Sequence, residues 1–140
     1  MIIHVVQQGR LRDPAVAALR DEYAKRFARF GRLAISEREP RGEALLWPEG
    51  VRWRIALDER GEDLASAAFA KRLAAWSQAH GPLGFLVGAA DGLHQPSRAA
   101  ANAAIRLSAM TLPHQLAHLI LVEQLYRAAT LLAGHPYHRA

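Results

Sequence analysis

Residues 107–114 read Leu107-Ser108-Ala109-Met110-Thr111-Leu112-Pro113-His114. A short apolar run ends at Thr111, a proline follows, and an apolar segment of about twenty residues begins at once. This pattern predicts the carboxyl end of a β-strand followed by a helix. Open α/β sheets place ligands at that edge, where loop N–H and C=O groups are available and the helix N-terminus favours anions. A capped connection without a ligand is the alternative interpretation.

The length of 140 residues indicates a single domain, residues 1–140, with one core. The chain has no cysteine, which excludes disulfides and thiolate metal sites. No uncharged apolar run approaches the roughly 18 residues of a membrane-spanning helix, and Met1-Ile2-Ile3-His4 lacks a basic leader segment. We therefore expect a soluble, unprocessed, cytoplasmic protein without a membrane segment.

The charge distribution favours RNA as a partner. The formal net charge is +5, and of the 18 basic residues only Lys25 and Lys71 are lysines. Arginine suits phosphate because its planar guanidinium bonds two oxygens at once. In the first predicted helix and its flanks, three acidic residues stand against a larger basic set: Arg10, Arg12, Arg20, Lys25, Arg26, Arg29 and Arg32. This excess predicts an RNA-facing patch, and a solvated helix face or a codon bias toward arginine is the alternative explanation.

Strand and helix patterns alternate along the chain. Strands are predicted at 2–7, 33–37, 51–57, 83–87 and 105–108, and helices at 14–30, 64–80, 96–104 and 113–133. Asp13 and Asp63 are the expected N-caps of the first two helices, and residues 38–50 are expected to be a loop with a possible helical turn at 43–47. The alternation predicts an α/β fold with a mainly parallel sheet flanked by helices.

The last predicted helix is apolar nearly all the way round. Its apolar positions are Leu116, Leu119, Ile120, Leu121, Val122, Leu125 and Tyr126. A surface helix should have one polar face. We therefore expect this helix to be covered by its own sheet and by a second subunit, which predicts a homodimer.

Three predicted loops follow strands, at 57–61, 88–92 and 107–113, and we expect them to form one pocket. Gly88 and Gly92 would let the backbone approach a ligand, but Gly-x-x-x-Gly is neither a dinucleotide fingerprint nor a phosphate-binding P-loop. His114 and His118 have metal-ligand spacing without a third ligand, so no metal site is expected. Glu123 and Arg127 are expected to form an ion pair.

The carboxyl-terminal segment reads His135-Pro136-Tyr137-His138-Arg139-Ala140. Most chain termini fray and carry no function. This one concentrates two imidazoles, a phenol and a guanidinium, which are groups that stack on bases, titrate near neutral pH and bind phosphate.

Four blocks carry a resemblance to a known family: Leu86-Val87-Gly88-x-x-Asp91-Gly92-Leu93, the segment 107–114, Glu123-Gln124-Leu125-Tyr126-Arg127-Ala128, and His135-Pro136-Tyr137-His138-Arg139. Together, and in this order, they resemble the RlmH family, the ribosomal large-subunit pseudouridine N3-methyltransferases of the SPOUT class. The resemblance covers essentially the whole chain. It departs at one loop, where relatives tend to have Gly-Gly-Pro-Glu-Gly and this chain reads Gly88-Ala89-Ala90-Asp91-Gly92.

The resemblance implies a SPOUT-type α/β knot, in which the C-terminal segment forms a trefoil knot that topology rules alone would reject. It also implies a homodimer with the knot at the interface, and 23S rRNA, in the ribosome, as substrate. The implied cofactor is S-adenosyl-L-methionine, held by the positions that match Leu57, Gly88, Leu107, Ser108, Ala109, Met110, Thr111 and Leu112.

The implied reaction transfers the sulfonium methyl group to N3 of a pseudouridine, with orientation of the two reactants as the main catalytic factor. His138 or Tyr137 would accept the N3 proton or orient the base, and Arg139 would bind phosphate together with the basic first helix. Two alternatives remain open at this point: a non-catalytic RNA-binding module with the same fold, and a SPOUT methyltransferase that acts on another RNA such as tRNA.

Overall fold

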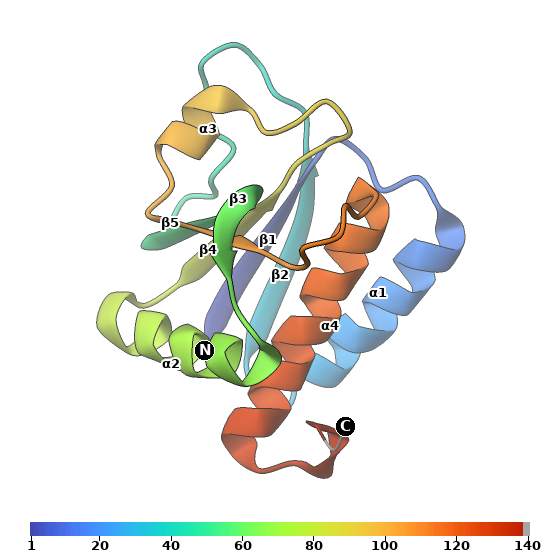
Figure 1. Ribbon diagram of the computed structural model, residues 1–140, viewed down its shortest axis with the longest axis vertical. Coiled ribbons are helices and arrows are strands. Elements are labelled where there is room, and N and C mark those ends of the chain that lie inside the picture. The colour runs from blue at the N-terminus through green and yellow to red at the C-terminus, as the bar shows by residue number, and fades with distance from the viewer. Residues whose placement is uncertain (139–140) are drawn as a thin grey trace.

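The computed structural model describes residues 1–138 and contains a five-stranded sheet (Figure 1). The strands follow the order β2-β1-β4-β3-β5 across the sheet. Their bounds are β1 Ile2–Gln8, β2 Arg32–Arg38, β3 Trp53–Asp63, β4 Leu83–Val87 and β5 Ala103–Arg106. All four strand pairings are parallel, which confirms the predicted sheet.

Helices cover both faces of this sheet. They are α1 Pro14–Phe27, α2 Ser66–His80, α3 Gln95–Ala99 and α4 His114–Ala133, followed by the 3₁₀ turn η1 Pro136–His138. Figure 1 shows α4 lying between α1 and α2 on one face, and α4 packs against both of them. The other face is covered by α3 and the loop before β3, whose Leu46 and Trp47 pack on Val6 and Leu86.

Local chemistry explains where most elements begin and end. The Asp13 carboxylate accepts hydrogen bonds from the N–H groups of Ala15 and Val16, so it caps α1 as predicted. Strand β4 is buried along its whole length because it lies between β1 and β3, which matches its continuous apolar run. Helix α4 ends at Gly134, whose φ of 70° is the left-handed conformation that glycine adopts easily.

The predicted cap at Asp63 is wrong. Strand β3 continues through Asp63, which pairs with Arg106 of β5, and α2 begins only at Ser66 after Ala65, which makes no side-chain capping bond. The possible helical turn at 43–47 is absent, because the N–H of Leu46 bonds instead to the Ser97 hydroxyl oxygen at 2.9 Å. The predicted strand at 105–108 and helix at 96–104 are both displaced, to Ala103–Arg106 and Gln95–Ala99.

Strands β3 and β5 have an unusual register. Ile105 pairs with Leu57 and also with Glu62, so β5 lies against two successive parts of β3. Gly61 is required there, because a Cβ atom at this position would lie 2.6 Å from the backbone nitrogen of Ile105. A strand enclosed in this way is compatible with the expected knot, but the knot itself stays a prediction.

Helix α4 is the central helix of the fold. By length and mean hydropathy it is the one helix within residues 1–138 that meets the criteria for a membrane span, but such a match is weak because buried core helices share these properties. Here Leu121, Val122 and Leu125 are fully buried against the sheet and the flanking helices. Its apolar circumference is therefore explained partly by α1 and α2 of the same chain. Leu116 and Leu132 remain more than 40% exposed, and the homodimer stays a prediction.

Candidate functional site

A cleft of about 1060 Å³ lies at the carboxyl edge of the sheet. Two of the three predicted loops line it, after β4 and β5, because carboxyl ends of parallel strands meet at one edge. The third predicted loop, 57–61, is wrong: β3 continues through Asp63 because it pairs with β5, and residues 57–60 line the cleft as part of that strand. The cleft brings together every residue expected to hold the cofactor: Leu57, Gly88, Leu107, Ser108, Ala109, Met110, Thr111 and Leu112. We refer to it below as the strand-edge cleft.

The loop after β4 is a tight turn. The N–H of Gly92 donates to the carbonyl of Ala89 at 3.0 Å, and Gly92 has a φ of 100° that disfavours other residues. Gly88 lies close to the side chain of Leu93, since a Cβ atom there would be 3.2 Å from its Cδ2. The turn therefore presents mainly backbone groups to the cleft.

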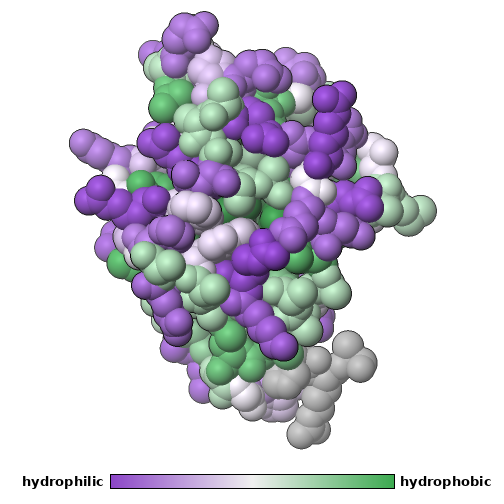
Figure 2. Space-filling model, turned by 60° about the vertical axis from the view of Figure 1, so that its left-hand side comes forward, coloured by the Kyte–Doolittle hydropathy of each residue, from purple (hydrophilic) through white to green (hydrophobic). Residues whose placement is uncertain are grey.

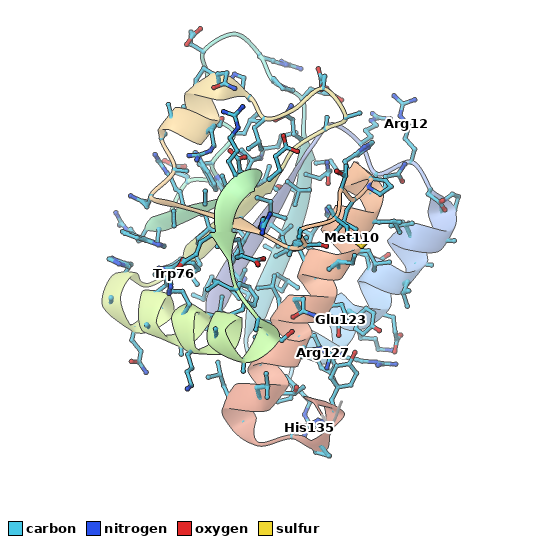
Figure 3. The ribbon with its side chains drawn as sticks, viewed as in Figure 1. Arg12, Trp76, Met110, Glu123, Arg127 and His135 are labelled. Atoms are coloured by element: carbon cyan, nitrogen blue, oxygen red, sulfur yellow. The ribbon has the colours of Figure 1, made fainter. Side chains whose placement is uncertain are left out.

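The loop after β5 is more open. Met110 is 78% exposed, and its N–H is held by the Ser108 hydroxyl oxygen at 2.9 Å. Pro113 precedes α4 and makes no side-chain capping bond, and Pro113, His114 and Ala117 line the cleft, so the start of the helix forms part of its wall. Figure 3 shows Met110 beside the first turns of α4. This end of the cleft is therefore accessible from solvent.

One ionised carboxylate belongs to the wall of the cleft. Asp58 accepts a hydrogen bond from Nε of Arg98 at 2.8 Å and another from the N–H of Arg60 at 2.9 Å. The bond from Arg98, followed by the one from Arg60, holds the pKa of Asp58 below its ordinary value. The cleft thus combines apolar walls, backbone groups and charged side chains of both signs, Asp58 and Glu59 with Arg60, Arg98 and Arg106. These features fit a nucleoside donor such as S-adenosylmethionine, which has a base, hydroxyl groups, a sulfonium, an ammonium and a carboxylate.

The tail folds back against the second half of α4 and reaches Glu123 in its middle. The hydroxyl of Tyr137 donates to Oε1 of Glu123 at 3.0 Å, and the ring of Tyr137 packs 4.5 Å from that of Tyr126. The guanidinium of Arg127 bonds the same Glu123 oxygen at 2.9 Å and lies 5.2 Å from the Tyr137 ring centre. The expected ion pair is confirmed, and it holds the tail (Figure 3).

Burial, followed by hydrogen bonding to Tyr23 and Glu123, raises the pKa of Tyr137 well above its ordinary value. The phenol therefore stays protonated near neutral pH. The side chain of His138 and all of Arg139 fall outside the described residues.

The strand-edge cleft and the tail do not meet within one chain. The cleft includes the first turn of α4, whereas η1 follows the last turn (Figure 1). Tyr137 folds back from there and bonds Glu123, which lies about 14 Å along the helix axis from His114. The structure therefore brings the expected cofactor residues together but leaves Tyr137 outside the lining of the cleft.

The comparisons with known proteins agree with this geometry. A family model described as "Predicted SPOUT methyltransferase" matches residues 1–138. The chain belongs to the SPOUT methyltransferase family. Curated relatives named ribosomal RNA large subunit methyltransferase H include those of Anaeromyxobacter sp. (strain Fw109-5), 41% identical with 99% of this chain and 100% of the relative covered, and of Roseobacter denitrificans, 42% identical with 99% of both covered.

A solved structure, TrmJ from Z. mobilis ZM4, shares the SPOUT fold. It has a TM-score of 0.54 and 14% identity, and the match covers 91% of this chain and 69% of that one. At this level of identity the likeness concerns the fold alone.

The predicted basic patch of this SPOUT protein is partly neutralised. Arg20 pairs with Asp21 at 2.7 Å and Arg26 pairs with Glu22 at 3.0 Å. Arg10, Arg12 and Arg38 line a second hollow of about 510 Å³ at the ends of β1 and β2, shared with two glutamates. Figure 2 shows a different side of the molecule, turned toward α2 and α3, where hydrophilic and apolar areas are mixed. The loop before α1 is thus a better RNA-contact candidate than the helix itself.

Sequence reasoning missed a set of buried polar residues beside the cleft. Gln7 and His118 are fully buried, and Gln8 is 5% exposed. The signal in the sequence is a pair of glutamines at the end of an apolar strand. Within residues 1–138, no group of three or more His, Cys, Asp or Glu side chains is arranged to hold a metal ion.

Proposed function

We propose that this protein methylates ribosomal RNA of the large subunit, with S-adenosylmethionine as methyl donor and N3 of a pseudouridine in 23S rRNA as acceptor. The observation that carries the proposal is the strand-edge cleft, in which all eight expected cofactor residues meet. The names of the full-length relatives support the choice of RNA. An rRNA substrate also implies that the protein works in the cytoplasm.

The loops would hold the donor through backbone groups of residues 88–92 and 107–112. When bound, S-adenosylmethionine supplies an electrophilic methyl group to a nucleophilic nitrogen. Leu57 and Leu107 of the lining would exclude water from the inner wall, and the ionised Asp58 would accept hydrogen bonds from hydroxyl groups of the donor. Fixing the two reactants in line, with water excluded, contributes several kcal/mol to such a transfer.

The acceptor side would come from a second subunit. Tyr137 does not line the cleft of its own chain, which supports a proposal that the tail serves the cleft of a partner across a dimer interface. Exposed Leu116 on α4 and Met110 beside it give that interface apolar surface near the cleft. The proposed assembly is a homodimer with a composite site, in which one chain holds the donor and the other presents the base.

The tail residues would have different roles. Tyr137 has a raised pKa and donates to Glu123, which suits it to orient the tail rather than to accept a proton. His138 is the proposed acceptor of the N3 proton, because imidazole titrates near neutral pH. Arg139, with Arg10 and Arg12, is proposed to bind phosphate.

A direct experiment tests the reaction. Purified protein is incubated with labelled S-adenosylmethionine and large ribosomal subunits or free 23S rRNA, and the modified nucleoside is identified by mass spectrometry. Methylpseudouridine in 23S rRNA is the expected product. Transfer to tRNA instead, or donor binding without transfer to any RNA, would refute the proposed substrate.

Heterodimers test the composite site. One subunit carries Gly88→Val in the cleft and the other His138→Ala in the tail, so that one intact site remains in each mixed dimer. We expect each homodimer to be inactive and the mixture to recover part of the wild-type rate. No recovery from a mixture that has formed heterodimers would contradict a site shared between subunits.

A further inference from the structure

Two consecutive glutamines end the first strand. Gln7 and Gln8 are both buried, in a strand whose other buried residues are Ile3, Val5 and Val6. Burying an amide is unfavourable unless its donors and acceptor are hydrogen-bonded. Because side chains alternate along a strand, the two amides lie on opposite faces of the sheet. We call them the glutamine pair.

Gln8 bonds the chain where it leaves the turn after β4. Its Nε2 donates to the carbonyl of Gly92 at 2.8 Å, and its Oε1 accepts from the N–H of His94 at 2.8 Å. Both halves of the amide are therefore used on one short segment of backbone. Since residues 88–92 contain no proline to restrict φ, these bonds supply a restraint that the turn sequence lacks.

Gln7 bonds the chain where it enters the same turn. Its Nε2 lies 3.2 Å from the carbonyl oxygen of Gly88 and 2.9 Å from that of Gln8. Its Oε1 lies 3.0 Å from Nδ1 of His118. His118 is one turn beyond His114, which lines the cleft. Gln7 thus connects the turn after β4 with the helix that follows the loop 107–113.

The orientation of these groups is determined by their partners. Gln7 must direct its NH₂ group toward the carbonyls, so its Oε1 faces His118 and requires a protonated Nδ1. The Nε2 atom of His118 is buried without a hydrogen-bond partner among residues 1–138. An apolar side chain would remove this unpaired nitrogen but would leave Oε1 of Gln7 without its donor. The imidazole is therefore costly for packing alone and is explained by its bond to Gln7.

We infer that Gln7, Gln8 and His118 are positioning residues for the methyl donor, which fix the turn between Gly88 and Gly92 and connect it to α4. They touch the donor only through the backbone of that turn. The inference rests on the proposed function, because it takes the strand-edge cleft as the donor site. It adds to that function the side chains that give the donor loop its shape.

The test replaces each glutamine by methionine, which has a similar volume and no amide. The matched control is Ile3→Val, a buried change in the same strand at the end remote from the cleft. For Gln7→Met and Gln8→Met, we expect the calorimetric Kd for S-adenosylmethionine to rise roughly tenfold, as for loss of one buried hydrogen bond. The KM for the RNA substrate should stay unchanged, whereas Ile3→Val should change neither constant.

A pair of variants at His118 tests the connection to α4. Asparagine can place an N–H donor near the position of Nδ1 and leucine cannot. We expect His118→Leu to raise the calorimetric Kd for the donor as much as Gln7→Met does, and His118→Asn to recover most of the lost affinity. The double variant Gln7→Met/His118→Leu should be no worse than the single ones, because both remove the same bond. Equal effects of Asn and Leu would refute the proposed role of His118.

Amide hydrogen exchange separates this inference from the proposed function. We expect residues 88–94 to exchange faster in Gln8→Met than in Ile3→Val, with or without donor. Unchanged exchange at 88–94 together with unchanged donor affinity would overturn the inference. If the wild-type protein binds no donor, the proposed function fails and the exchange rates alone decide whether the glutamine pair holds the turn. If Gln7→Met does not fold, Gln8→Met carries the comparison.

Discussion

The two ends of α4 hold their functional segments in different ways. At the N-terminal end, the strand-edge cleft is lined by backbone groups of residues 88–92 and 107–113, and Met110 points into solvent. Beyond the C-terminal end, Tyr137 folds back along the helix and is fixed by side chains, through Glu123 and the tilted ring of Tyr126. The cleft can hold a small donor but has no group to present a nucleobase. The tail offers groups that could present a base but forms no cavity of its own.

The difference follows from what each end has to bind. A small donor with a charged sulfur is bound well by closely approaching backbone and small residues, which leave room and offer many hydrogen bonds. A nucleobase within a large RNA needs stacking groups and guanidinium groups on a fixed support. Because Tyr137 is fixed to Glu123 and does not line the cleft of its own chain, the proposed dimer would unite the two parts.

The largest effect should come from adding a side chain to the cavity end. Gly88→Val would place atoms against Leu93, where a Cβ atom alone would already lie at 3.2 Å. We expect the affinity for S-adenosylmethionine, measured by calorimetry, to fall roughly a hundredfold or more. Gly50→Val is the control, because its Cβ atom would meet no atom within 4 Å even though its φ of 90° is strained. Comparable donor binding by both variants would mean that the cleft is not the donor site.

A second effect should appear in the pH dependence of stability, through His118 beside the cleft. Burial, followed by the positive charge of Arg20, lowers the pKa of His118 to about 4. At pH values between 4 and the unfolded pKa, the unfolded chain binds a proton at His118 that the folded chain excludes. The neutral buried imidazole therefore contributes its full stability above the unfolded pKa, and that stability is lost as pH falls toward 4. Between pH 7 and pH 5 the free energy of unfolding should fall by about 2 kcal/mol through this residue.

Urea unfolding of the wild type and of His118→Asn, at pH 5 and pH 7, measures this contribution. His4 also has a lowered pKa, through burial and the charges of Arg32 and Arg38, but it titrates alike in both proteins. Only the difference between the two pH dependences is therefore assigned to His118. A wild-type protein with the same pH dependence as His118→Asn would show that the imidazole is not buried in its neutral form.

Local sequence patterns predicted the cavity end well. Strand β4, the loop after it and the start of α4 are encoded by neighbouring residues: an apolar run, two glycines and a proline. The cap at Asp63 was wrong because pairing of β3 with β5 overrides the local preference of aspartate for a helix start. The expected knot came from the resemblance to a family, since no periodicity in the chain encodes it.

The side-chain network at the cavity end was beyond sequence reasoning. Gln7 and His118 are 111 positions apart, and nothing in a single sequence pairs them. The tail was predicted only in part, because the bond between Glu123 and Arg127 has helical spacing whereas the bond from Tyr137 depends on how the chain turns at Gly134. Backbone sites were therefore predictable from strand ends, and long-range side-chain contacts were not.

A third, smaller effect should appear at the anchored end. Glu123→Gln keeps the shape of the side chain but removes the charge that binds Arg127 and accepts from Tyr137. We expect single-turnover methyl transfer to slow roughly tenfold, since a charge-assisted bond contributes about 1.5 kcal/mol, while the Kd for the donor stays unchanged. Glu22→Gln, which breaks an exposed pair with Arg26, is the control and should leave both quantities unchanged. Loss of donor affinity in Glu123→Gln would contradict the separation of the two ends.

The smallest effect is expected outside both ends, at the loop before α1. Arg12 is exposed beside the second hollow and forms no salt bridge within residues 1–138 (Figure 3). If it contacts phosphate, Arg12→Gln should weaken binding of 23S rRNA about threefold and reduce the slope of log K against log salt by about one contact, without changing donor affinity. Arg72→Gln is the matched control. Arg72 lies on α2, away from this loop, and is paired with Glu62 of β3. Equal RNA affinity of the two variants across a salt series would place the RNA on another surface and leave the basic residues around α1 as a solvated face.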